Sequence, residues 1–187
     1  MRRGFVLVTL VLVSMLAACG PSTAGSSEPD TAKEKAPKPT MSTAENPKLT
    51  VGETAITTEA GNKLTVHSYE SPLSPKGSKP NPGFEFSAID VEGCASPTSA
   101  RDLMHIGPVA FTLQMPDGAR VMPEVFGNKD AEVKEPALQT MDPGPGTCER
   151  GFVTYQTPRD ERPELVIFKE QFVTNVPDIA WKIPDER

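Results

Sequence analysis

Proline and glycine interrupt nearly every stretch of ten residues, and this punctuation constrains the fold more than any other feature of the chain. The 187 residues include 20 prolines and 14 glycines. Both residues destabilise helix interiors, because proline lacks the backbone N–H and glycine loses the most conformational entropy on folding. The pattern therefore favours short strands joined by turns over a helical domain.

Short runs of β-branched and aromatic residues begin at about Leu49 and recur between turn residues at intervals of roughly 8–15 residues. This spacing is typical of an all-β sandwich of antiparallel strands. The expected strands are Glu53–Thr58, Lys63–Glu70, Gly83–Glu92, Val109–Met115, Arg120–Pro123, Ala137–Met141, Arg150–Thr157, Glu164–Glu170 and a last segment near Ile179–Ile183.

Three of these segments carry information about burial. In Val109–Met115, the residues Phe111, Leu113 and Met115 alternate with smaller or polar ones, so one face should be buried. The alternation in Gly83–Glu92 slips by one residue, which fits either a bulge or a central strand buried on both faces. Leu165–Phe168 is apolar throughout, which also predicts a central strand.

The N-terminus has the pattern of a secretory signal. Arg2 and Arg3 precede an apolar run, Phe5–Met15. An anchoring helix is the alternative, but the run is short for a membrane span and no charge cluster follows it. The segment Leu16-Ala17-Ala18-Cys19 resembles the bacterial lipobox. That resemblance implies cleavage before Cys19 and attachment of diacylglycerol to its thiol, with acyl chains such as palmitate as the anchor.

These features divide the chain into three parts. We expect residues 1–18 to be a lipoprotein signal peptide and residues 49–187 to form the sandwich domain. Residues 19–48 are rich in Ser, Thr, Pro, Lys and Glu and should form a disordered tether, because they cannot bury enough apolar surface to order themselves. The expected location is the extracytoplasmic face of a cell membrane, with the lipid anchor as the contact to the bilayer.

The cysteine count agrees with this arrangement. Lipidation of Cys19 leaves an even pair, Cys94 and Cys148, which should form a disulfide in an oxidising compartment. A loop of about 55 residues closed by that bond implies roughly 4 kcal/mol of stabilisation on the chain-entropy model. A thioredoxin-like site and a metal site are the alternatives. Neither has support in the sequence, because there is no Cys-x-x-Cys and no histidine close to either cysteine.

The charge of the chain excludes one class of partner. Removal of the signal peptide would change the net charge from −6 to −8, because two of the 19 basic residues are lost and none of the 25 acidic ones. A strongly acidic domain is repelled by nucleic acids and by anionic lipid headgroups. We therefore expect no nucleic-acid partner and no membrane contact by the folded domain itself.

Several segments together form a recognisable pattern: Val51–Ala55, Leu64–Val66, Phe84–Val91, Phe111–Leu113 with Asp117-Gly118, and Pro143-Gly144 ahead of Gly151–Val153. This pattern resembles the telokin-like, immunoglobulin-type domain found in bacterial lipoproteins. The resemblance covers roughly residues 49–170 and implies an immunoglobulin-like sandwich. Most members have no known function, so it implies no catalytic residues. Cys94 departs from the pattern, since the family often has asparagine there.

Motifs for catalysis are missing from the sequence, which has no Gly-x-Ser-x-Gly elbow, no His-Glu-x-x-His and no phosphate-binding glycine loop. The two histidines, His67 and His105, have no carboxylate cluster at ligand spacing in the sequence. We place His67 in a strand, on the face that also carries Thr65 and Tyr69. The expectation is a protein that is not an enzyme and holds no cofactor and no metal.

One loop is a candidate for recognition. Arg159, Asp160, Glu161 and Arg162 stand between Pro158 and Pro163 and connect two expected strands. The alternative is a solvated hairpin tip whose ion pairs contribute little. Sandwich domains often bind through such loops.

Three hypotheses about function remain open. The first is a non-catalytic envelope module that binds an envelope protein or a small extracellular ligand through its loops. The second is a small-molecule carrier or sensor, which needs an apolar pocket. The third is an envelope enzyme, which needs titratable groups that converge in a pocket.

Overall fold

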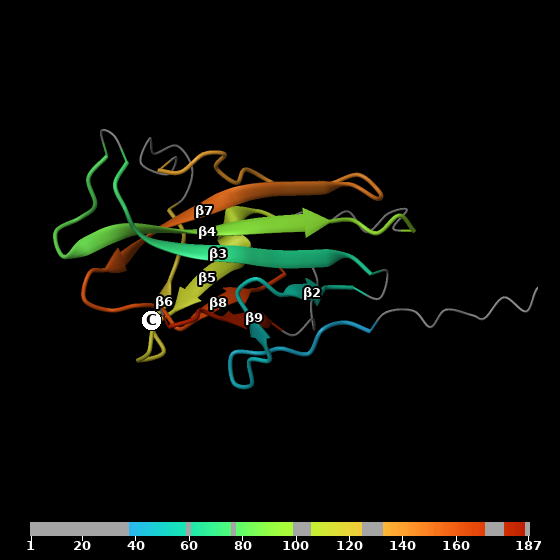
Figure 1. Ribbon diagram of the computed structural model, residues 1–187, viewed down its shortest axis with the longest axis horizontal. Helices are drawn as coiled ribbons and strands as arrows, with labels where there is room; N and C mark the ends of the chain where they lie inside the picture. The colour runs from blue at the N-terminus through green and yellow to red at the C-terminus, as the bar shows by residue number, and fades with distance from the viewer. Residues whose placement is uncertain are drawn as a thin grey trace, which may run out of the picture. The chain divides into compact units, whose positions relative to one another are not determined.

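Two β-sheets pack face to face in this protein, as Figure 1 shows. The computed structural model describes residues 38–58, 61–75, 78–98, 106–124, 133–170 and 178–185. One sheet has the strand order β1-β9-β8-β5-β6 and the other β2-β3-β4-β7. The strands are β1 Leu49–Thr50, β2 Thr54–Ile56, β3 Lys63–Leu73, β4 Phe84–Cys94, β5 Phe111–Gln114, β6 Arg120–Val121, β7 Cys148–Pro158, β8 Leu165–Phe168 and β9 Ile179–Lys182.

All neighbouring strands are antiparallel except β1 and β9, which pair in parallel. The prediction of an all-β, immunoglobulin-like sandwich is confirmed. Within the residues that the structure describes, no helix is long and apolar enough to cross a membrane.

The core lies between the two sheets. The inward faces contribute large aliphatic and aromatic side chains that are almost fully buried, and burying each stabilises the fold by about 1.5–3 kcal/mol. Phe111 and Phe168 pack against each other with ring centroids 5.3 Å apart. Trp181 of β9 is 0% exposed, and its indole N–H donates to the Glu53 carbonyl at 2.9 Å.

The burial patterns of three strands agree with the sequence. β8 lies between β9 and β5, so it is a central strand as predicted, and β4 lies between β3 and β7, which is the second of the two alternatives that its slipped alternation left open. Every residue of β8 is buried. In β5, Phe111 and Leu113 are buried while Thr112 and Gln114 are half-buried, which confirms the predicted alternation.

A β-bulge in β3 changes which side chains face the core. Val66 pairs with Val91 and Ser68 with Asp90, so His67 is an extra residue on β3. An extra residue exchanges the two faces of a strand. Tyr69 therefore joins Val66 in the core, and the prediction that Tyr69 shares the face of His67 is wrong.

Two other local predictions differ from the structure, and one observed strand was not predicted. Residues 137–141 form no strand. Ala137 bridges to Phe152 whereas Met141 bridges to Ile106, so the two ends of this short segment pair with different parts of the chain. Val109 lies in a 3-10 helix, Pro108–Ala110, which proline at the first position favours. β1 was not predicted, since two residues are too few to show alternation.

The sandwich has two ends that differ in what they carry. At the disulfide end, β3 begins, β4 ends at Cys94 and β7 begins at Cys148. At the loop end, β3 and β4 are joined by the hairpin 74–83, and β7 ends at Pro158.

Residues before Leu49 also contact the sandwich. Thr40 donates its N–H to the Ile56 carbonyl at 2.8 Å, on the free edge of β2. Ser42 is buried, and its hydroxyl donates to the Ala180 carbonyl at 2.6 Å. The end of the predicted tether therefore packs against the domain. Ile56 pairs with Lys63 near the disulfide end, so the described chain starts at that end (Figure 1).

Candidate functional site at the loop end

The predicted recognition loop, Arg159–Arg162, connects β7 to β8 and is held at both of its ends. Arg159 donates its backbone N–H to the Gly83 carbonyl at 3.1 Å and its Nε to the Phe84 carbonyl at 2.9 Å. The guanidinium of Arg162 lies 4.9 Å from the centre of the Tyr69 ring, within cation–π range. The contacts at each end fix the tip, where Asp160 and Glu161 are exposed.

Three hollows meet at this loop. The first, of about 220 Å³, is lined by all four loop residues together with Tyr69, Ser71 and Glu85. The second, of about 380 Å³, shares Arg159 and Glu85 with the first. The third, of about 410 Å³, shares Arg162 with the first and extends along β8 and β9 past Leu165 and Lys182. The whole loop therefore lines the first hollow, and its two arginines each also line one neighbouring hollow.

The hairpin 74–83 and the end of β3 supply the opposite wall of the second hollow. Pro72, Pro75 and Pro80 line it, and prolines give that wall a restricted backbone. Ser71 donates its hydroxyl to the Glu85 carboxylate at the boundary between the first two hollows. Sequence reasoning missed Tyr69, Ser71 and Glu85, because only the strand pairing brings them next to residues 159–162.

A buried tyrosine lies on the inner face of the four-stranded sheet. Tyr155 of β7 is fully buried, and its hydroxyl has no hydrogen-bond partner among the described residues. Burial raises the pKa of Tyr155 well above its usual value, and the nearby Tyr69 raises the pKa further. Tyr155 therefore stays neutral at physiological pH.

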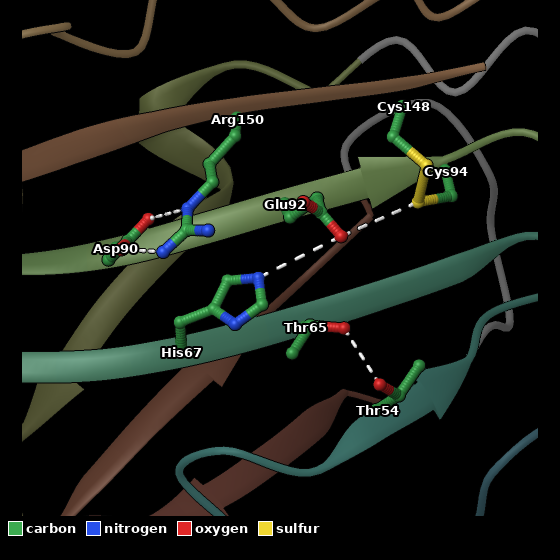
Figure 2. A network of polar contacts seen from close by, with 8 residues as sticks. All are labelled: Thr54, Thr65, His67, Asp90, Glu92, Cys94, Cys148 and Arg150. Atoms are coloured by element: carbon green, nitrogen blue, oxygen red, sulfur yellow. Dashed lines mark hydrogen bonds and ion pairs between the residues drawn. A yellow bond between two sulfur atoms is a disulfide. The ribbon is translucent and has the colours of Figure 1, made fainter.

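Polar side chains also gather on the outer face of the four-stranded sheet, as Figure 2 shows. Arg150 makes a two-point contact with Asp90, and its Nε donates to Oδ1 at 2.8 Å. The Asp90 side chain is 7% exposed, and the Arg150 side chain covers it while remaining 52% exposed. This hydrogen bond is the main cause that raises the pKa of Arg150.

The same face carries a second polar group next to the disulfide. His67 Nε2 lies 3.8 Å from Glu92 Oε1, and Glu92 Oε1 lies 3.7 Å from Cys94 Sγ. Cys94 and Cys148 stand opposite each other in the β4–β7 pairing and form a disulfide, as predicted. Cys19, His105 and the signal peptide lie outside the described residues.

The fold places this chain in the class of immunoglobulin-like β-sandwich domains. The yjhA protein of Bacillus subtilis is similar over 73% of this chain and 99% of its own, with 14% identity and a TM-score of 0.50. The secreted protein MPT63 of Mycobacterium tuberculosis is similar over 71% and 94%, with 13% identity and a TM-score of 0.47.

The lipoprotein candidate ycdA of Bacillus subtilis is similar over 65% of this chain, with 12% identity and a TM-score of 0.48. The matched region spans only 36% of ycdA. No family model and no curated protein sequence matches the chain. At these identities the likeness concerns the fold alone.

Proposed function

We propose that this chain is a lipoprotein anchored through Cys19 at the extracytoplasmic face of a cell membrane, where its sandwich binds another envelope protein without catalysing a reaction. The observation that carries the binding role is the position of Arg159–Arg162, which together line one hollow and through Arg159 and Arg162 also border two neighbouring hollows. The lipobox-like segment that ends at Cys19 carries the anchoring role.

The fixed geometry of the loop supports binding. Contacts of Arg159 with the start of β4 and of Arg162 with Tyr69 order the loop before any partner arrives. A preordered loop loses less conformational entropy on association, so more of the contact energy becomes affinity. Asp160 and Glu161 remain exposed to contact a partner.

A protein partner fits this surface better than a single small ligand. Protein interfaces spread over about 800 Å² on each side, which suits several connected hollows. A small ligand has one supporting observation, because the hollow of about 410 Å³ lies within the usual size range of small-molecule sites. The lining of that hollow mixes charged side chains such as Glu164 and Lys182 with apolar ones, so it is not the predominantly apolar lining that is usual for a small-molecule site.

Photo-crosslinking in the source cells tests the binding role on the full-length chain. A photoreactive residue at Asp160 should form discrete adducts with a partner, whereas the same residue at Glu149, near the disulfide end, should not. Replacing Arg159 and Arg162 by Ser in the Asp160 derivative should abolish the adducts. Identical adduct patterns from the two positions would contradict a binding site at the loop end.

The anchoring role has its own test. Labelled palmitate should be incorporated into the wild-type chain and not into the Cys19→Ser variant. Equal incorporation in both would contradict lipidation at Cys19.

A further inference from the structure

We propose that Cys94, Cys148, Glu92 and His67 form a binding site for Zn²⁺ when the disulfide is reduced. The sequence alone predicts no metal site, because His67 lies far from both cysteines along the chain. The pairing of β3 with β4 and of β4 with β7 brings these residues together on one face of the sheet (Figure 2).

Two of the distances between donors are those of a tetrahedral site, and the two sulfurs, which are bonded to each other in the disulfide, separate on reduction. Zinc bonds of about 2.0–2.3 Å place neighbouring ligand atoms about 3.3–3.8 Å apart. Glu92 Oε1 lies 3.7 Å from Cys94 Sγ and 3.8 Å from His67 Nε2. The donor atoms of Glu92, Cys94 and Cys148 all lie within 4.8 Å of one another. His67 is not part of that group, so its ring would have to turn toward the sulfurs to supply the fourth donor.

The state of His67 supports its assignment as a ligand. Its Nε2 atom is buried and makes no hydrogen bond within the described residues. The bulge in β3 places His67 as an extra residue between Val66 and Ser68. Bulges often aim a side chain at a functional site, and here the bulge puts an imidazole nitrogen beside Glu92.

Electrostatics explains why the site depends on reduction. In the disulfide, neither sulfur carries a charge or a free thiolate. Two thiolates beside Glu92 would repel one another, and a divalent cation removes that repulsion. The nearby guanidinium of Arg150 also attracts Glu92, but it is bound to Asp90. Two thiolates, an imidazole and a carboxylate favour zinc over the oxygen-seeking Mg²⁺ and Ca²⁺.

The chemistry balances in two steps. A dithiol reductant supplies two electrons and two protons, the Cys94–Cys148 bond breaks, two thiols form, and the reductant becomes a disulfide. Zn²⁺ then binds as the two thiols release their protons to solvent. The metal would replace the covalent link between the end of β4 and the start of β7.

Cobalt titration tests this site. The full chain carrying Cys19→Ser, held in detergent micelles and reduced with a phosphine, has thiols only at Cys94 and Cys148. One equivalent of Co²⁺ should give tetrahedral d–d absorption and a thiolate charge-transfer band, and Zn²⁺ should displace it. The oxidised chain should give neither signal.

Variants separate the four-residue site from simple dithiol binding. Glu92→Gln and His67→Ala should each weaken Co²⁺ binding by about 10–100-fold. Removing a residue that only orients a metal ligand already weakens metal binding by that factor, so removing a ligand should weaken it no less. Glu149→Gln is the matched control, because it removes the same charge next to Cys148 but on the opposite side of the strand. Equal affinity in the wild type, Glu92→Gln and His67→Ala would overturn the proposal.

Trp181 fluorescence follows folding during the titration. Native Trp181 fluorescence in the reduced, metal-loaded chain supports the site. If reduction alone unfolds the chain, recovery of native fluorescence when the metal is added also supports it. A reduced chain that stays unfolded when Co²⁺ or Zn²⁺ is present would overturn it.

Discussion

The two ends of the sandwich share the same strands but are held in different ways. At the disulfide end, Cys94 and Cys148 join β4 to β7 covalently, and Thr40 covers the edge of β2. At the loop end, single hydrogen bonds and a cation–π contact hold Arg159–Arg162 in place. Hollows border this loop at the loop end.

This difference suggests a division of labour. A rigid scaffold that is stabilised at one end can carry loops at the other end whose side chains are not needed for stability. The comparison predicts that substitutions near the disulfide end change the free energy of unfolding, whereas substitutions in the loop change binding.

The largest expected effect is the loss of the disulfide. Replacing both Cys94 and Cys148 by Ala should lower the free energy of unfolding by about 4 kcal/mol, since the bond closes a loop with a sequence separation of 54 residues. Urea denaturation in the presence of a chelator measures this, and the chelator prevents a metal from replacing the bond. A loss below about 1 kcal/mol would show that the disulfide end does not dominate stability.

The next effect concerns close packing in β7. A Cβ atom on Gly151 would lie 2.9 Å from the Leu138 Cα, which is backbone and cannot rotate away. Gly151→Ala should therefore destabilise the fold by about 1–3 kcal/mol. Gly144→Ala is the control, because the nearest atom to its Cβ would be a Thr147 hydroxyl at 3.7 Å. Equal unfolding midpoints in urea for the two variants would contradict a tightly packed β7 edge.

Much of the fold follows from the sequence because strands in a sandwich have a period of two. The buried face of β5 and the central positions of β4 and β8 could be predicted from alternation and from apolar runs. The bulge at His67 could not, because an extra residue shows only when β3 is paired with β4. β1 was missed for a related reason, since it exists through its parallel pairing with β9.

The candidate sites divide along the same line. Arg159–Arg162 is contiguous in the sequence, and its charges between two prolines mark it as a loop. Tyr69 and Glu85 reach that loop only through the antiparallel pairing of β3 with β4. The contact between His67 and Glu92 likewise depends on pairing, so no spacing in the chain indicates it.

A smaller effect, of opposite sign, is expected in the core between the two ends. Tyr155→Phe should raise the free energy of unfolding by about 1 kcal/mol, because it removes a buried hydroxyl that has no hydrogen-bond partner within the described part of the chain. A higher free energy of unfolding for Tyr155→Phe would sharpen the comparison, because it would show that an unfavourable contribution to stability lies in the core and not at the loop.

Alkaline pH extends this test. The pKa of Tyr155 is raised in the folded state, so the unfolded chain loses the proton first, near pH 10. Wild-type stability should then fall by about 1.4 kcal/mol for each pH unit above about 10, relative to Tyr155→Phe. Urea denaturation of both proteins at several pH values measures the difference. A constant difference between them would show that Tyr155 titrates normally.

The smallest effect on stability is expected at the loop itself. Replacing Arg159, Asp160, Glu161 and Arg162 by Ser should change the free energy of unfolding by no more than about 1 kcal/mol, because surface ion pairs and exposed side chains contribute little. The loss of the Arg162 contact with Tyr69 accounts for most of that change. Urea denaturation and photo-crosslinking from a retained position in the hairpin, Lys79, should be measured on the same preparations. A variant with native stability that no longer crosslinks would separate recognition from stability, whereas a loss comparable to that of the disulfide variant would make the loop part of the scaffold.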